Sequence, residues 1–158
     1  MPLPKELLMF IISAVPLLEL RASIPYGFLA GLPPLMVFIL SVIGSWLPSF
    51  FVVFVLEHIE PFLRRIKFLD DFLTKLYAKT RAKSTQVQKW EFWGLIAFVG
   101  IPLPGTGVWT GSLAGYLFGL NKPKIILASL LGTTLAGLLM VLIMALGISG
   151  FEWLFKSA

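Results

Sequence analysis

Glu19 and Arg21 are the residues best suited to chemistry, because no other side chain between Leu7 and Leu56 is charged. A charge at the centre of a bilayer costs about 2.5 to 3.5 kcal/mol on insertion scales, so such residues usually face a partner or a wet cavity. A carboxyl group there can exchange a proton, and a guanidinium offers phosphate oxygens a planar fork of donors. We therefore predict a buried polar centre at residues 19–25. The alternative is an arginine that snorkels to the headgroups beside a glutamate in a short surface loop.

Two stretches of the chain are poorly built for a straight helix. In ELRASIP (residues 19–25), Pro25 removes a backbone donor and biases Ile24 out of helical geometry, and Pro16 does the same to Val15 upstream. We therefore expect the helix to break in this stretch. In GIPLPGTGVWTG (residues 100–111), prolines and glycines predict a second break. Non-helical backbone at membrane depth needs protein or water around it, so both breaks are candidate binding segments. The predicted substrate- or ion-binding residues are Glu19, Arg21, Pro25, Pro102, Pro104, Gly105, Thr106, Gly107, Trp109 and Thr110.

The composition is that of an integral membrane protein. Of the 158 residues 58% are hydrophobic, and the mean hydropathy is +0.91. Further uncharged runs cover residues 92–121 and 125–151, and each exceeds the roughly 20 residues that a spanning helix needs. The runs lack the alternating ten-residue segments of an outer-membrane barrel. The predicted class is therefore an all-α integral membrane protein, located in the cell membrane.

We predict a single membrane domain over residues 1–158. Repeat 1 covers residues 6–57 and repeat 2 covers residues 92–148, and each is expected to hold a re-entrant helical hairpin followed by one transmembrane helix. The two crossings are placed at residues 35–56, with a kink at Pro48, and at residues 125–147. A cytoplasmic linker at residues 58–91 joins the repeats.

The linker region is rich in charge. Between residues 57 and 91 eight Lys or Arg stand among five acids. Apolar residues recur there at three- and four-residue steps, which predicts an amphipathic helix on the membrane surface. Its stripe consists of Phe62, Leu63, Ile66, Leu69, Phe72, Leu73, Leu76 and Tyr77. Two interpretations remain open: a contact with anionic lipid, or a connector that only fixes the topology.

The two halves of the sequence are related. Residues 27–56 align without gaps on residues 115–144, and glycines coincide on either side of one span. A hairpin plus one crossing is an odd number of passes, so the second repeat must be inverted. A cytoplasmic linker and a cytoplasmic turn at Lys122 and Lys124 put eight plus two, or ten, basic residues inside, against Lys5 and Lys156 outside. Inverted repeats with broken helices are typical of secondary transporters, whose sites lie near the midplane. This architecture places residues 19–25 opposite residues 100–107.

At these two stretches the sequence resembles the putative small multidrug export protein family, in which an E-L-R-x-x-I-P segment is paired with I-P-L-P-G-T-G-x-W-T-G. Both motifs are present, as Glu19 to Pro25 and Ile101 to Gly111. That family is similar to the DedA group, and the resemblance implies re-entrant hairpins, membrane-embedded charges and proton-dependent translocation of a lipid carrier. This chain departs from the DedA pattern because it has no charged residue between Glu91 and Lys122.

Two functions are compatible with these features. The first is a membrane transporter or a lipid or lipid-carrier flippase, coupled to a proton or a cation, with membrane lipids and a small-molecule or anionic-lipid substrate as partners. The second is a non-transporting structural or assembly factor in which Glu19 and Arg21 only neutralise each other. Enzyme motifs, a phosphate loop and cysteine are absent, so we expect no enzyme, cofactor or metal site. The basic charge is explained by membrane orientation, which removes the need for a nucleic-acid partner.

Small residues at four-residue spacing allow helices to approach closely. They occur at Gly27 and Gly31, and again at Gly111, Gly115 and Gly119. Packing within one chain is the first interpretation, and a homodimer is the second.

Overall fold

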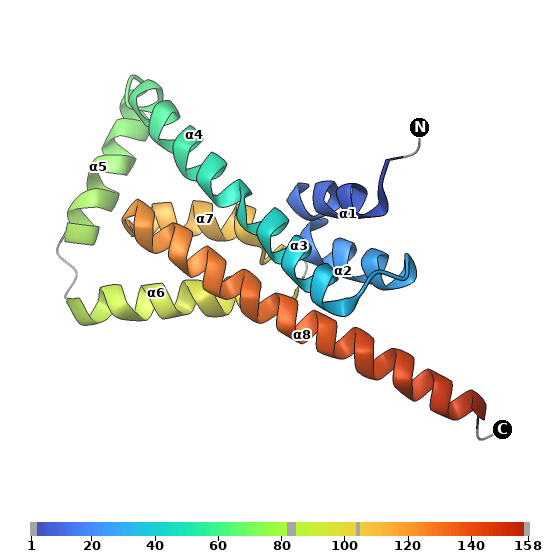
Figure 1. Ribbon diagram of the computed structural model, residues 1–158. Coiled ribbons are helices and arrows are strands. Elements are labelled where there is room, and N and C mark those ends of the chain that lie inside the picture. The colour runs from blue at the N-terminus through green and yellow to red at the C-terminus, as the bar shows by residue number, and fades with distance from the viewer. Residues whose placement is uncertain (1–2, 82–84, 104, 157–158) are drawn as a thin grey trace.

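The computed structural model describes residues 3–81, 85–103 and 105–156, with side chains at all of these except residues 76–77, 80–81, 85–88 and 148–156 (Figure 1). Every regular element in this part of the chain is a helix. The elements are α1 (Lys5–Ala14), α2 (Glu19–Leu29), α3 (Pro34–Trp46), α4 (Pro48–Leu63), α5 (Lys67–Arg81), α6 (Thr85–Gly100), α7 (Val108–Leu117) and α8 (Lys122–Lys156).

Two helical hairpins point toward each other. The α1–α2 hairpin and the α6–α7 hairpin enter from opposite ends of the molecule, and their tips lie near its middle (Figure 1). Beside them run α3–α4 and α8, which pack against each other, and α1 and α6 lie on α3 and α8 respectively. The indole Nε1 of Trp46 donates to the carbonyl oxygen of Ile126 at 3.0 Å and ties α3 to α8.

Two stretches are long and apolar enough to cross a membrane: Pro34–Leu63, which comprises α3 and α4, and Lys122–Gly147 in α8. The predicted kink at Pro48 is confirmed, because α3 ends at Trp46 and α4 begins at Pro48. Proline suits the first position of a helix, where its missing N–H has no intrahelical partner to lose. Ser45, just before the kink, donates to the carbonyl oxygen of Ser13 at 3.0 Å and fastens α3 to α1.

The predicted helix break at Pro25 is wrong. The chain leaves helical geometry earlier, between the end of α1 at Ala14 and the start of α2, and Pro25 lies inside α2. Leu17 and Glu19 have φ angles of 70° and 46°, in the left-handed region that side chains rarely adopt. A proline inside a helix loses the hydrogen bond to the residue four positions back, and its ring crowds the carbonyl of that residue, at a cost of about 3 kcal/mol or more. The helix α2 continues through Pro25 in spite of this cost. The tip of the first hairpin is therefore centred on residues 15–18.

The region from residue 57 to residue 91 is not one amphipathic helix. α4 continues to Leu63, a hydrogen-bonded turn follows, α5 covers Lys67–Arg81, and α6 begins at Thr85. The apolar stripe is divided accordingly, since Phe62 belongs to α4 and Ile66 to the turn. The side chains of Leu76 and Tyr77 lie outside the described part.

The second break is shorter than expected: it covers residues 101–107, because α7 begins at Val108.

The predicted correspondence between the halves appears in the local geometry. Gly31 and Gly119, which are 88 positions apart, have φ angles of 75° and 77°. After α2, the amide of Leu32 donates to Gly27 at 3.0 Å, and after α7 the amide of Leu120 donates to Gly115 at 3.0 Å. Both are helix ends closed by a left-handed glycine. The starts of α3 and α8 are likewise 88 residues apart.

Equivalent glycines also bring equivalent helices together. A Cβ on Gly44 would lie 3.0 Å from the carbonyl oxygen of Phe10 in α1, and a Cβ on Gly132 would lie 3.1 Å from that of Ile96 in α6. A Cβ on Gly115 would lie 3.1 Å from Ile125, within the same chain. Internal packing therefore accounts for these glycines, and a homodimer stays a prediction.

Candidate functional site

The Glu19 carboxylate lies against the first turn of α7. Glu19 is the first residue of α2 and is only 3% exposed. Its carboxylate lies beside Gly107 and near the backbone N–H groups of Val108 and Trp109, whose dipoles favour its negative charge. These N–H groups have no partner within their own helix, and the helix dipole favours a negative charge at this end. Glu19 therefore caps a helix that follows it by almost ninety residues.

Gly107 makes this approach sterically feasible. It is the N-cap residue of α7, and its backbone is extended. A Cβ at this position would lie 2.0 Å from Oε2 of Glu19, so no side chain fits between the two. The carboxylate occupies the space that any other residue would fill.

Arg21 connects the carboxylate to the second break. Its Nη1 donates to Oε2 of Glu19 at 2.8 Å, and its Nη2 donates to Oγ1 of Thr106 at 3.0 Å. The Thr106 hydroxyl lies 2.7 Å from the carbonyl oxygen of Ile101, to which it can donate in turn. The Arg21 side chain is 15% exposed, and its Nε is buried with no acceptor among the described residues. The predicted meeting of residues 19–25 with residues 100–107 is thus confirmed by the direct hydrogen bond between Arg21 and Thr106.

The remaining predicted residues shape the second hairpin tip. Thr110 donates to the carbonyl oxygen of Gly105 at 2.7 Å and closes the turn in which Gly105 has a φ angle of 86°. The indole Nε1 of Trp109 donates to the carbonyl oxygen of Ala14, at the tip of the first hairpin, at 3.3 Å. The Trp109 contact therefore joins the two tips, whereas the Thr110 contact shapes the second tip alone.

The prolines predicted to belong to the site are not among the residues that contact Glu19 and Arg21. Pro25 lies one helical turn beyond Arg21 in α2, and Pro102 lies in the irregular segment between α6 and α7. Pro104 is outside the described residues. The structure thus brings together Glu19, Arg21, Thr106, Gly107 and the backbone of Trp109.

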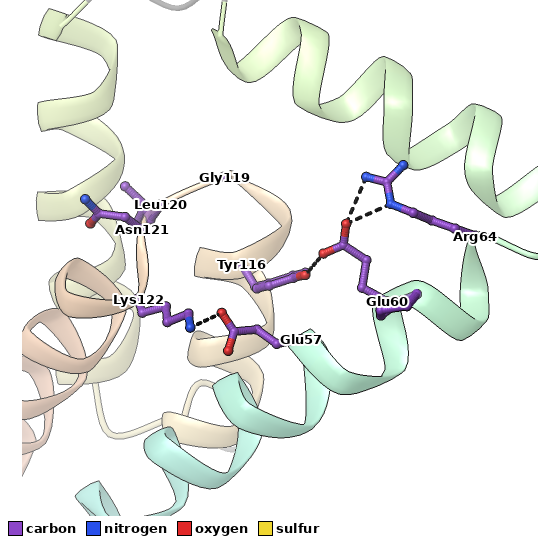
Figure 2. A pocket seen from close by; sticks show the side chains of 9 residues that line it. Glu57, Glu60, Arg64, Tyr116, Gly119, Leu120, Asn121 and Lys122 are labelled. Carbon is purple, nitrogen blue, oxygen red and sulfur yellow. Dashed lines mark hydrogen bonds and ion pairs between the residues drawn. The ribbon is translucent and has the colours of Figure 1, made fainter.

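A second polar cluster was not predicted from the sequence. A cavity of about 540 Å³ lies where α4 ends and the turn between α7 and α8 begins (Figure 2). Lys122 forms an ion pair with Glu57, and the hydroxyl of Tyr116 donates to Glu60. Glu60 also accepts from Arg64 at 2.8 Å. The available signal was the charge pattern, since an acid ends the first span and a lysine begins the second.

Buried hydroxyl pairs recur in both halves and were also missed. The hydroxyl of Ser23 in α2 donates to that of Ser41 in α3 at 2.7 Å. In the second half, Ser112 of α7 faces Ser129 of α8, with their hydroxyl oxygens 3.4 Å apart. Ser41 and Ser129 are matched in the internal alignment, which was the available sequence signal.

An all-helical chain with two apolar helices of spanning length, and a charged pair buried between two hairpin tips, has the features of a helical membrane protein. The family model described as putative small multi-drug export protein matches residues 19–139. The chain belongs to this family. The matched region begins at Glu19, the first residue of α2, and includes the second hairpin tip. A search of curated proteins and a search of solved structures each found no match.

Proposed function

We propose that the protein is a membrane transporter, acting as a flippase for a lipid or lipid carrier with an anionic group and coupled to a proton at Glu19. One observation carries this proposal. The Glu19 carboxylate is held by Arg21 and, at the same time, by the first N–H groups of α7. These donors are those that would bind a phosphate, since a guanidinium and a helix N-terminus both bind phosphate oxygens.

Competition for these donors provides the coupling. While Glu19 is ionised, its own carboxylate occupies Arg21 and the α7 N-terminus, and an incoming anion would meet like charge. A protonated Glu19 is neutral and holds these donors weakly, because hydrogen bonds to an ionised acceptor are about twice as strong. The anion then binds to donors that the carboxylate has released. Arg21 contributes a further donor through its buried Nε.

The arrangement of the halves supports alternating access. Their helix ends and glycine contacts correspond at matched positions, and the site combines α2 of one half with the start of α7 of the other. We propose that the hairpins are re-entrant, that the repeats are inverted, and that the hairpin tips form a site near the membrane midplane. Rocking one half against the other would then expose the same site to each side. The resemblance to the DedA group favours a lipid carrier as the substrate.

The second candidate is a structural or assembly factor. It is favoured by the protein donors that already surround Glu19, because a carboxylate that is neutralised by its own neighbours can hold two hairpins together without any ligand. The two candidates differ in whether the wild-type protein produces flux.

Reconstitution into vesicles tests the proposal. Vesicles of neutral phospholipid would carry a trace of a fluorescent phosphatidylglycerol or a fluorescent polyprenyl phosphate, and dithionite would report which leaflet holds the probe. We expect wild-type protein to equilibrate at least one probe between leaflets, with a rate that depends on pH. Glu19→Gln should fold and move the probe with a rate nearly independent of pH, because glutamine cannot ionise.

Glu6→Gln is the matched control, since Glu6 is exposed at the start of α1 and should keep the wild-type pH profile. Absence of flux for both probes at every pH in wild-type vesicles would reject the flippase and leave the structural role. A Glu19→Gln protein with the wild-type pH profile would reject coupling at Glu19 and leave transport itself intact.

A further inference from the structure

Helix α5 stands at one end of the molecule. It links the end of α4 to the start of α6 and runs across the direction of α6 and α7 (Figure 1). The first candidate span ends at Leu63, and α5 begins at Lys67 after a turn of three residues. A helix that follows a spanning segment so closely and turns across it lies at the depth of the lipid headgroups. This placement depends on α3–α4 crossing the membrane and does not depend on transport.

One face of α5 combines exposed aromatic and basic side chains. Phe68, Phe72, Lys75 and Lys79 follow one another at steps of four, three and four residues, which places them on one side of a helix. Phe68 is 78% exposed and Phe72 is 52% exposed, while both lysines are exposed. Leu73, at another position around the helix, is buried and is the residue that packs inward. The aromatic and basic face is therefore directed away from the protein.

Charge distinguishes between two possible partners of this face, a second copy of the protein and an acidic lipid surface. Residues 64–81 contain six Lys or Arg and two Asp, and one of the acids, Asp70, is paired with Arg64 at 2.9 Å. A second copy of the same basic face would be repelled. An acidic lipid surface would be attracted, with the phenyl rings at the boundary of the acyl chains and the lysines reaching toward phosphates.

We propose that α5 binds the acidic phospholipids of the adjacent leaflet through Phe68, Phe72, Lys75 and Lys79. The phenyl groups anchor the helix, and the two lysines make the anchoring selective for anionic headgroups. The connection between the two halves of the protein is thereby attached to the membrane surface and responds to its charge.

The test uses introduced single cysteines, because the protein has no cysteine of its own that would also be labelled. Phe68→Cys, Phe72→Cys and Thr74→Cys are each given a nitroxide label in the full-length protein, in nanodiscs of phosphatidylcholine alone or with one third phosphatidylglycerol. Thr74 is exposed on another side of α5 and serves as the matched position. With phosphatidylglycerol, labels at 68 and 72 should be accessible to oxygen and shielded from a water-soluble nickel complex, whereas the label at 74 should show the reverse.

Charge removal tests the role of the lysines. In the Phe72→Cys background, partitioning of the label into acidic nanodiscs should fall by about fivefold for each of Lys75→Gln and Lys79→Gln. Lys67→Gln, on another face of α5, is the control and should change it much less. High salt should lower the partitioning of the label as much as Lys75→Gln and Lys79→Gln do together, because ions screen surface charge.

Three outcomes overturn the proposal. Labels at 68 and 72 that stay accessible to nickel in every lipid show that the face is in water. Equal shielding in phosphatidylcholine and in phosphatidylglycerol shows insertion without a preference for acidic lipid. Dipolar broadening between labels on two molecules shows that a second copy covers the face.

Discussion

Gly107 and Glu19 meet from opposite halves of the chain, with no space between the glycine backbone and the carboxylate. An added Cβ on Gly107 would lie 2.0 Å from Oε2 and 2.2 Å from the carboxyl carbon of Glu19. Atoms that are not bonded to each other do not come this close, so any side chain at residue 107 must displace the carboxylate. The glycine is thus part of the charged site, although it has no functional group of its own.

We expect Gly107→Ala to lower the melting temperature of the protein in detergent, by an amount equivalent to about 1 to 3 kcal/mol of overpacking. The methyl group would push Glu19 away from α7 and leave its N–H groups without an acceptor. Gly94→Ala is the control, since no atom lies within 4 Å of a Cβ built at that position in α6. Alanine is favoured in helices by up to about 1 kcal/mol, so this variant should be equally or more stable. Equal melting of Gly107→Ala and wild type would show that the carboxylate does not need its observed position.

The sequence was most informative where membrane physics leaves few choices. Two charges in a long apolar run must be buried together or face water, and they form the observed pair of Glu19 and Arg21. The pattern of glycines around residues 31 and 119 predicted two matching turns, because few other residues adopt positive φ. The spans followed from length and hydropathy alone.

The sequence was least informative where tertiary contacts override local preferences. Pro25 marks a helix break in isolation, yet it is held inside α2. The break lies upstream, where Val15 before Pro16 is extended and Leu17 and Glu19 adopt positive φ angles. The role of Gly107 as a space for a carboxylate depends on a residue far away in sequence. The cluster of Glu57, Tyr116 and Lys122 likewise arises only when two helix ends meet.

Gly132 provides a second test of close packing, this time between α6 and α8. A Cβ on Gly132 would lie 2.6 Å from Cβ of Val99 and 3.1 Å from the carbonyl oxygen of Ile96. Backbone and Cβ atoms cannot rotate away, so Gly132→Ala should lower the melting temperature clearly. Gly115→Ala should have a smaller effect, because its shortest contact, 2.8 Å, is to the end of the Leu95 side chain. The reverse order of the two melting temperatures would contradict the observed packing of α6 on α8.

The topology can be tested with single cysteines and an impermeant maleimide. Figure 1 places the N-terminus at the opposite end of the molecule from α5. We therefore expect Thr74→Cys, on the side of α5 away from the proposed lipid contact, to be labelled from the cytoplasmic side and Leu3→Cys from the outside, in line with the basic charge near α5. Both positions are exposed, so lack of access does not explain a negative result. Labelling of both from one side would contradict a membrane crossing between them.

The final prediction concerns reversal of the charged pair, Glu19→Arg combined with Arg21→Glu. Removing one member of a buried pair typically costs about 3 to 5 kcal/mol. If mutual neutralisation were the whole role of the pair, the reversed protein would regain most of that stability.

The contacts of Glu19 predict a different result. Its carboxylate also lies near the N–H groups at the start of α7, and a guanidinium, which has no acceptor, cannot interact favourably with them. Reversal would place a cation at the positive end of a helix dipole, an effect of up to about 2 kcal/mol in partly buried sites. We expect the reversed protein to melt well below wild type in detergent. Reversal of Glu57 and Lys122 is the matched control, because these side chains are 31% and 59% exposed and exposed pairs contribute only about 0 to 1 kcal/mol. A reversed Glu19 and Arg21 pair that melts at the wild-type temperature would show that α7 does not require an acceptor at this position, and the competition proposed for proton coupling would lose its physical basis.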